Sequence, residues 1–285
     1  MRNINKYCVN LALIILKITL KKILLFLILL SFSCNTGNLT VIADLPSSLK
    51  EVSAAETTTF SDLLWVIEDA GNKNRLYGLN EKGEIKREIK ISNAKNKDWE
   101  DLTSDIEGNI YIGDFGDNHK KRKKYRILKV KHPKKKTTKI TPKHINFTLP
   151  IDIKSLDFEA FFLLNDFFYL FSKNEKHGKL FKVPNTVGNH EAIFMTNFNL
   201  KGKNNKITSA AISNDNKTIA LLNHDKVWLI TNFKNDDFFK GDIRVLEFNH
   251  DSQKEGVCFK NDSTLYITDE KSHGKGGNLY ELKIE

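Results

Sequence analysis

Cysteine is scarce in this chain. Among 285 residues there are three cysteines, at positions 8, 34 and 258. Cys8 lies in a basic and apolar N-terminal segment, Cys34 directly follows that segment, and Cys258 lies inside an apolar stretch. We interpret Cys258 as a small core residue, so the sequence excludes a disulfide framework.

Several motifs that identify catalytic, nucleotide-binding and zinc-binding classes are also absent. The chain contains no Gly-x-Ser-x-Gly nucleophile elbow, no P-loop and no GxGxxG dinucleotide motif. None of its eight histidines stands at ligand spacing from a cysteine or another histidine, which argues against zinc. The segment 114–118 has acidic spacing similar to part of a calcium loop, but it lacks the twelve-residue EF-hand pattern. We expect it to turn the chain out of a strand, with Asp114 pointing to the central channel predicted below.

The first 33 residues contain no acidic residue. Half of the formal net charge of +10 lies there, in Arg2, Lys6, Lys17, Lys21 and Lys22. A short apolar run (23–30) and the sequence Ser31-Phe32-Ser33-Cys34 follow, which is typical of a secretory signal over residues 1–33. The ending resembles a bacterial lipobox, in which Cys34 becomes the lipidated first residue. We therefore expect an exported, lipid-anchored protein of the bacterial cell envelope.

Two alternatives to lipidation stay open at this point. One is a cleaved signal without a lipid, and the other is an uncleaved membrane anchor. The run 11–30 would span a bilayer poorly because three lysines interrupt it.

Two runs of basic residues follow in the rest of the chain, at 119–124 and 134–136, which we expect to lie near each other in one repeat. A nucleic-acid surface would require interleaved aromatic residues, and Tyr125 alone is adjacent. We interpret the segments as solvated loops or as a contact for an anionic envelope surface. We expect a monomer whose membrane contact is the lipid on Cys34, and no nucleic acid as a partner.

A unit of about 50 residues occurs five times in the chain. Each copy begins at a polar residue, continues as an apolar strand, turns at Asn or Asp and returns as a second strand. The first positions are 51, 100, 159, 209 and 255, which are 49, 59, 50 and 46 residues apart. Periods of about 40–50 residues with four short strands are typical of a β-propeller. We therefore predict an all-β propeller over residues 47–285.

Each repeat shows its strands in the same order. In the second repeat they are expected at 100–104, 109–113, 125–130 and 145–149, and Gly108 supplies the positive φ of a tight hairpin. The strands of the other repeats are expected at 63–67, 75–79 and 85–91; at 167–171, 179–183 and 192–196; at 218–222, 227–230 and 243–248; and at 264–268 and 278–282. The second and third strands of the repeats are very apolar, for example 167–171, which fits blades packed face to face with both faces buried.

The fifth repeat lacks a fourth strand. Residues 34–46, the predicted lipidated N-terminus, contain a spare strand at 39–43. We predict that this strand is the outermost strand of the last blade and closes the ring. The count gives five blades, and six stays an alternative because the stretch 114–158 is long.

One face of the predicted propeller is polar in every repeat. The first strand of a blade starts, and the second ends, on the same face. The first strands start at Glu51, Glu100, Glu159, Ser209 and Glu255. The second strands end at Glu68-Asp69, Asp114, Ser172-Lys173, Asn223-His224-Asp225 and Asp269-Glu270.

Four glutamates that converge on one axis would repel one another unless a cation or a proton intervenes. A hard cation with oxygen ligands, Ca²⁺ first and then Mg²⁺ or Mn²⁺, is one solution. The candidate ligands are Glu51, Glu100, Glu159, Glu255, Asp114, Asn223 and Asp269. Ion pairs with Lys50, Lys173 or Lys254 are a second solution, and an anion or sugar site without metal is a third.

The quoted residues resemble a group of bacterial envelope β-propeller lipoproteins over most of the chain after residue 47. The resemblance rests on Asp98-Trp99-Glu100-Asp101, the segment 111–118, Asp157-Phe158-Glu159-Ala160, Gln253-Lys254-Glu255-Gly256 and Thr268-Asp269-Glu270. More distantly, the chain resembles the SMP-30/gluconolactonase-like propellers, whose calcium is held by Glu, Asn and Asp on different blades. That resemblance implies these roles for Glu100 or Glu255, Asn223 and Asp269. The clustered acids with Lys173 are similar to β-propeller phytases.

Two functions follow from these features. The first is a lipid-anchored binding or scaffold module whose partner is an envelope protein or a glycan. The second is a metal-dependent hydrolase of a lactone, ester or phosphoester, in which the metal polarises the substrate and a carboxylate activates water. The candidate catalytic residues are Glu100, Glu159, Glu255, Lys173 and His224. The fold alone does not decide between them.

Overall fold

The structure is a computed structural model that describes residues 17, 36–174, 177–272 and 275–284. The predicted cleavage and lipidation site at Cys34, and all of the predicted signal except Lys17, lie outside the described residues. The unit Gly37–Glu285 is compact. In the part of the chain that is described, no helix has the length and apolar character needed to cross a membrane.

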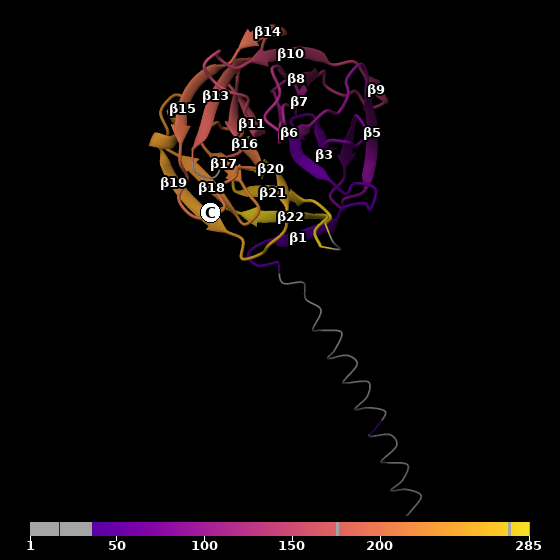
Figure 1. Cartoon of the computed structure of the whole chain (residues 1–285). Coiled ribbons are helices and arrows are strands. Elements are labelled where there is room, and N and C mark those ends of the chain that lie inside the picture. The colour runs from indigo at the N-terminus through magenta and orange to yellow at the C-terminus, as the bar shows by residue number, and fades with distance from the viewer. Residues whose placement is uncertain (1–16, 18–35, 175–176, 273–274, 285) are drawn as a thin grey trace, which may run out of the picture. The chain divides into compact units, whose positions relative to one another are not determined.

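Five sheets form a ring of blades, which confirms the five-bladed propeller and excludes the six-bladed alternative (Figure 1). The innermost strands are β2 (Val52–Thr58), β6 (Trp99–Ser104), β11 (Phe158–Leu164), β16 (Ser209–Ile212) and β20 (Lys254–Asn261). The second strands are β3 (Ser61–Glu68), β7 (Ile110–Asp114), β12 (Phe167–Ser172), β17 (Ile219–Leu222) and β21 (Thr264–Asp269). The third strands are β4 (Arg75–Leu79), β8 (Tyr125–Val130), β13 (Gly178–Pro184), β18 (Lys226–Thr231) and β22 (Asn278–Lys283).

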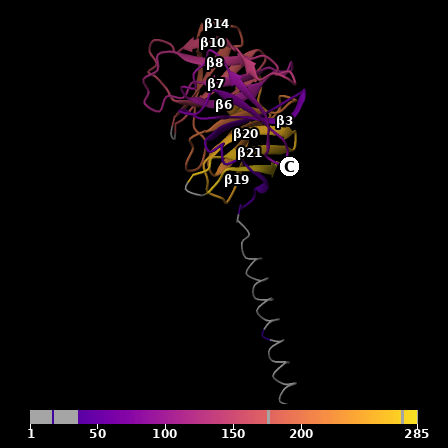
Figure 2. The same ribbon diagram turned by 90° about the vertical axis from the view of Figure 1, so that its right-hand side faces the viewer.

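The outer strands complete the blades. They are β5 (Ile85–Ile91), β10 (Lys143–Thr148), β15 (Ile193–Phe198), β19 (Asp242–Glu247) and β1 (Thr40–Asp44). The second, third and outer strands all agree with their predicted bounds within two residues at each end. The view turned by 90° places β6, β20 and β21 near the middle of the fold (Figure 2).

Two strands were not predicted. The short strand β9 (Lys139–Ile140) adds to β5 in parallel, and β14 (Gly188–Glu191) adds to β10 in parallel. Each strand comes from the next repeat in the chain and extends the outer edge of the preceding blade. One 3₁₀ turn, Phe238–Lys240, precedes β19.

The ring closes as predicted. Strand β1 pairs antiparallel with β22, from Thr40 opposite Glu281 to Asp44 opposite Asn278. The last blade therefore contains both ends of the propeller, and β1 is its outermost strand. On either side of β1, Leu39 and Leu45 are buried in the core.

The two basic segments do not lie together, contrary to the expectation from their spacing. Segment 119–124 enters β8 and segment 134–136 follows it, so the two lie at opposite ends of this strand. A strand of six residues spans roughly 20 Å. The charge is therefore divided between the two faces of the propeller and does not form one basic surface.

Candidate functional site

The acidic mouth is the end of the central channel where the inner strands begin and the second strands end. Strand register places the first residue of each inner strand opposite the last residues of its neighbour, for example Trp99 opposite Asp114 and Lys254 opposite Asp269. Four inner strands carry a β-bulge at this point, at Ser53, Glu100, Glu159 and Glu255. A bulge re-aims its residue out of the normal alternation.

At this bulge the first repeat departs from the positions that we matched among the five repeats in the sequence. Ser53, and not Glu51, occupies the position equivalent to Glu100. Glu51 precedes β2, is exposed and accepts a hydrogen bond from Asn72 Nδ2 at 2.6 Å. The predicted convergence of four equivalent glutamates is thus a set of three, with Glu51 on the rim.

Asp69, Asp98 and Glu100 form a compact carboxylate group at the junction of the first two blades. One oxygen from each lies within 4.8 Å of the others. Glu100 is only 6% exposed, and no donor among the described residues contacts its carboxylate. Burial and the charges of Glu159, Asp69 and Asp98 raise the pKa of Glu100 well above its ordinary value. Burial and the charge of Asp69 raise the pKa of Asp98 to about 6.

Gly116 allows this group to form. A Cβ atom at this position would lie 1.8 Å from Glu100 Oε1 and 2.7 Å from Asp98 Cγ. The backbone of the β7–β8 loop therefore packs directly against both carboxylates, which no larger residue permits. Because the nearest atom is the end of a flexible side chain, a methyl group here would displace Glu100 and leave the backbone in place.

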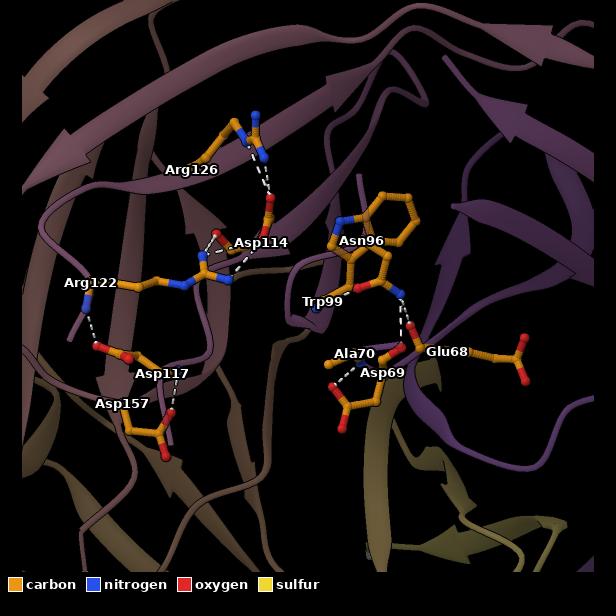
Figure 3. Close-up of polar contacts among 10 residues, drawn as sticks. All are labelled: Glu68, Asp69, Ala70, Asn96, Trp99, Asp114, Asp117, Arg122, Arg126 and Asp157. Carbon is orange, nitrogen blue, oxygen red and sulfur yellow. Dashed lines mark hydrogen bonds and ion pairs between the residues drawn. The ribbon is translucent and has the colours of Figure 1, made fainter. Parts of the chain in front are cut away.

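Asn96 fixes the end of β3 beside the carboxylate group. Its Nδ2 donates to the carbonyl oxygens of Glu68 at 2.7 Å and Asp69 at 2.8 Å, and its Oδ1 accepts from Trp99 N at 3.1 Å (Figure 3). One side chain thus ties the residue that follows β3 to the first residue of β6. The amide bridge therefore connects the two strand ends next to which Asp69 and Glu100 stand.

Lys173 acts electrostatically on Asp69 and Glu100, and its ammonium group lies 2.8 Å from Glu159. Burial lowers the pKa of Lys173, but Glu159, Glu255 and Glu100 outweigh this effect and raise it above its ordinary value. Glu255 Oε1 lies 2.9 Å from His224 Nε2. The contact between Lys173 and Glu159 is the arrangement that the ion-pair alternative predicts, whereas Glu255 contacts a histidine that this alternative did not name.

Asp114 does not point to the channel, contrary to our expectation. It pairs with Arg122 at 3.1 Å and with Arg126 at 2.5 Å, and Figure 3 shows it between the two guanidinium groups. Arg126 is its cross-strand partner in β8. Asp117 holds the same loop by accepting from the backbone N–H groups of Lys121 and Arg122. Both oxygens of Asp114 are therefore occupied by cationic side chains.

Asn223 and Asp269 are also engaged in local hydrogen bonds. Asn223 Oδ1 accepts from the N–H groups of Asp225 and Lys226, which forms a turn after β17. Asp269 is fully buried and accepts from Ser252, Asn278 and Tyr280. Of the seven candidate ligands, the structure brings Glu100 into a close carboxylate group. Its companions there, Asp69 and Asp98, were not among the predicted ligands, although both stand in segments that the sequence marks as polar.

A cavity of about 720 Å³ adjoins the acidic mouth at the fourth and fifth blades. Lys173 and His224 line it together with Asn223, Asp225 and His250. The cavity thus places a lysine and a histidine beside the carboxylate network, within the usual size range of a small-molecule site.

Asp101 joins the inner strands of several blades, and sequence reasoning missed this role. It is fully buried and accepts hydrogen bonds from Phe161 N at 3.0 Å, Ala210 N at 3.1 Å and Ser209 Oγ at 2.9 Å. Ser209 Oγ accepts in turn from Val257 N at 3.1 Å. One carboxylate on β6 therefore connects the inner strands of blades 2, 3 and 4, and reaches blade 5 through a hydroxyl group.

The raised pKa of Glu270 makes the stability of the fold depend on pH. Burial, followed by the charges of Glu255, Asp69 and Glu51, raises its pKa to about 8. Between pH of about 4.5 and 8, the Glu270 carboxyl group is protonated in the folded protein and ionised in the unfolded chain. Its contribution to the stability of the fold is therefore complete at low pH and is lost as pH rises through 8. We expect Glu270→Gln to melt roughly 2–4 °C above the natural protein at pH 8.5 with chelator, about 1 kcal/mol after solvent screening, and at the same temperature at pH 4. An equal difference at both pH values in thermal unfolding would contradict this assignment.

No protein-family model matches the chain, and no curated protein matches its sequence. Among solved structures, the PQQ-bound aldose sugar dehydrogenase of Streptomyces coelicolor is similar with a TM-score of 0.52 at 10% identity, over 87% of this chain and 98% of that chain. The Cps50 (Swd1) β-propeller domain of Myceliophteria thermophila gives 0.49 at 10% identity, over 87% and 100%. A chain of a nidogen/laminin complex gives 0.47 at 11% identity, over 81% and 80%. At such low identity, the similarity to the dehydrogenase shows the propeller fold alone.

Proposed function

We propose that this propeller is a binding module of the bacterial cell envelope that holds a divalent cation at its acidic mouth. The ligands would be Asp69, Asp98 and Glu100. The observation that carries the proposal is the close approach of their oxygens, within 4.8 Å, together with a buried Glu100 that has no donor among the described residues. Three carboxylates are a hard donor set, which suits Ca²⁺ first and Mg²⁺ or Mn²⁺ next.

The site's surroundings favour binding over catalysis. Lys173 and His224, the side chains best suited to polarise a substrate, are paired with Glu159 and Glu255. A cation would organise the first two blades and the β7–β8 loop into one rigid surface. We propose an envelope protein or glycan as the partner of that surface, and a lipid on Cys34 as the tether. Incorporation of a labelled fatty acid at Cys34 tests the tether.

The cation is tested on the full chain in detergent, with Ca²⁺, Mg²⁺ and Mn²⁺ compared by calorimetry and by melting temperature. A cation present at 100 times its Kd stabilises the fold by about 2.7 kcal/mol, so chelation should lower the melting temperature by roughly 5–11 °C. Glu100→Gln and Gly116→Ala should abolish this shift. Glu51→Gln should retain it, because Glu51 lies outside the carboxylate group. Absence of the shift in the natural protein overturns the proposed cation site.

A hydrolase is the second candidate, and the cavity of about 720 Å³ beside the acidic mouth favours it. In that case the cation would polarise the substrate oxygen, and one free carboxylate would activate water. Assays of lactones, esters and phosphoesters with the cation present distinguish the two functions. Turnover that is lost in Glu100→Gln and in Lys173→Met would replace the binding function by hydrolysis.

A further inference from the structure

The opposite mouth of the channel contains a second and larger cavity. The opposite mouth is the end of the channel where the inner strands finish and turn into the second strands. The cavity has a volume of about 1170 Å³, and all five blades contribute to its wall. Glu56 of β2 and Ser104 of β6 lie at its inner end, whereas Glu107 and Asp166 belong to the hairpin turns at its rim. It is separate from the acidic mouth, because none of Asp69, Asp98 and Glu100 lines it.

The wall of this cavity carries a surplus of negative charge. Its two lysines are already paired: Lys129 lies 3.7 Å from Asp105 and Lys260 lies 2.5 Å from Glu281. Four further wall carboxylates are exposed and form no ion pair within the described chain. They are Asp62, Glu81, Glu107 and Asp166. A cleft lined by one sign of charge concentrates ligands of the opposite sign.

Glu56 places a carboxyl group at the inner end of the cavity. Its carboxylate accepts a hydrogen bond from Ser104 Oγ at 2.8 Å. Burial raises the pKa of Glu56 to about 8, so ionisation is costly unless a positive group lies beside it. The ammonium group of a ligand would supply that charge and would replace water around the carboxylate.

The spacing of the acids distinguishes an organic cation from a metal ion. In the described part of the chain, the group of carboxylates close enough to share one ion lies at the acidic mouth and includes no residue of this cavity. Here the carboxylates are distributed over three blades, on the inner and second strands and in the hairpin turns. Such an arrangement suits several positive charges spaced along one flexible molecule. Hydroxyl and amide groups elsewhere on the wall, such as Thr58, Ser213 and Asn216, can accept N–H donors.

We propose that the opposite mouth binds a linear aliphatic polyamine, with one ammonium group on Glu56 and the others on the carboxylates of the rim. The ligand enters from the rim and extends toward the centre of the propeller. This site is independent of the cation at the acidic mouth and has a different ligand class.

The test is calorimetry of spermidine binding to the full chain in detergent at low ionic strength. We expect saturable one-to-one binding that weakens as salt is raised, because the interaction is between charges. Glu56→Gln should weaken binding at least tenfold. The rim variant Glu107→Gln/Asp166→Asn, whose side chains are exposed and which should fold normally, should weaken it about threefold to tenfold. Sorbitol, a neutral polyol, should not bind.

Control variants separate this proposal from the proposed function. Glu100→Gln should leave spermidine binding unchanged, and the rim variant should leave the Ca²⁺-dependent melting shift unchanged. Absence of saturable binding, or binding that survives both the Glu56 and the rim substitutions, overturns the proposal. Binding that is lost in Glu100→Gln also overturns it, because the polyamine would then occupy the acidic mouth.

Discussion

Replacing Asp101 by asparagine is expected to lower the free energy of unfolding by roughly 2–4 kcal/mol. The carboxylate accepts two hydrogen bonds on each oxygen, from the backbone of Leu102, Phe161 and Ala210 and from Ser209 Oγ. An amide nitrogen in place of either oxygen would face at least one backbone N–H. Each buried donor left without an acceptor costs about 1–3 kcal/mol.

The position of Asp101 makes this loss larger than that of an ordinary buried polar residue. It accepts from Ala210 and so connects blade 2 with blade 4, which are not consecutive in the chain, and Ser209 extends the connection to blade 5. Thermal unfolding should show a decrease of roughly 5–15 °C. The matched control is Asp62→Asn, an exposed acid on β3, which should change stability by less than about 0.5 kcal/mol. Equal melting temperatures for the two variants would show that Asp101 does not hold the blades together.

The fold could be predicted from the sequence because each blade repeats the same alternation of apolar strands and turns. Strands β9 and β14 could not, since their pairing depends on which outer edge they reach and their own residues carry no apolar pattern. Lys139–Ile140 is too short to show a period, and Gly188–Glu191 is polar. Both cover edges that would otherwise be open to another chain, a role that appears only in three dimensions.

The candidate site was predicted as a face and not as a set of ligands. The repeat located the polar starts of the inner strands, but a β-bulge shifts register by one residue, and the period cannot detect it. Residue type therefore placed Glu51 where the structure places Ser53. Asp114 shows a second limit: its partner Arg126 is fixed by the register of a hairpin with a long loop. The approach of Gly116 to Glu100 depends on the packing of that loop, which no local pattern encodes.

Strand β1 supports the whole ring through one blade, and its removal gives the second large expected effect. We expect a chain that begins at residue 46 to lose roughly 3–6 kcal/mol of unfolding free energy relative to a chain that begins at residue 36. Leu39 and Leu45 are 3% and 5% exposed, and burial of such a side chain contributes about 1.5–3 kcal/mol. The antiparallel ladder with β22 is lost as well.

Urea denaturation of the two chains measures this effect, and the matched control is Val41→Thr within β1. Val41 is 41% exposed, so its substitution keeps the ladder and should leave the midpoint nearly unchanged. Without β1, the edge of β22 is free to pair with another chain, and the shorter protein should therefore also self-associate. An unchanged midpoint in the shorter chain would mean that the N-terminal strand only covers an edge. The ring would then be held by its inner strands, with Asp101 as their common acceptor. A lowered midpoint together with self-association would show that the propeller needs both ends of its chain in one blade.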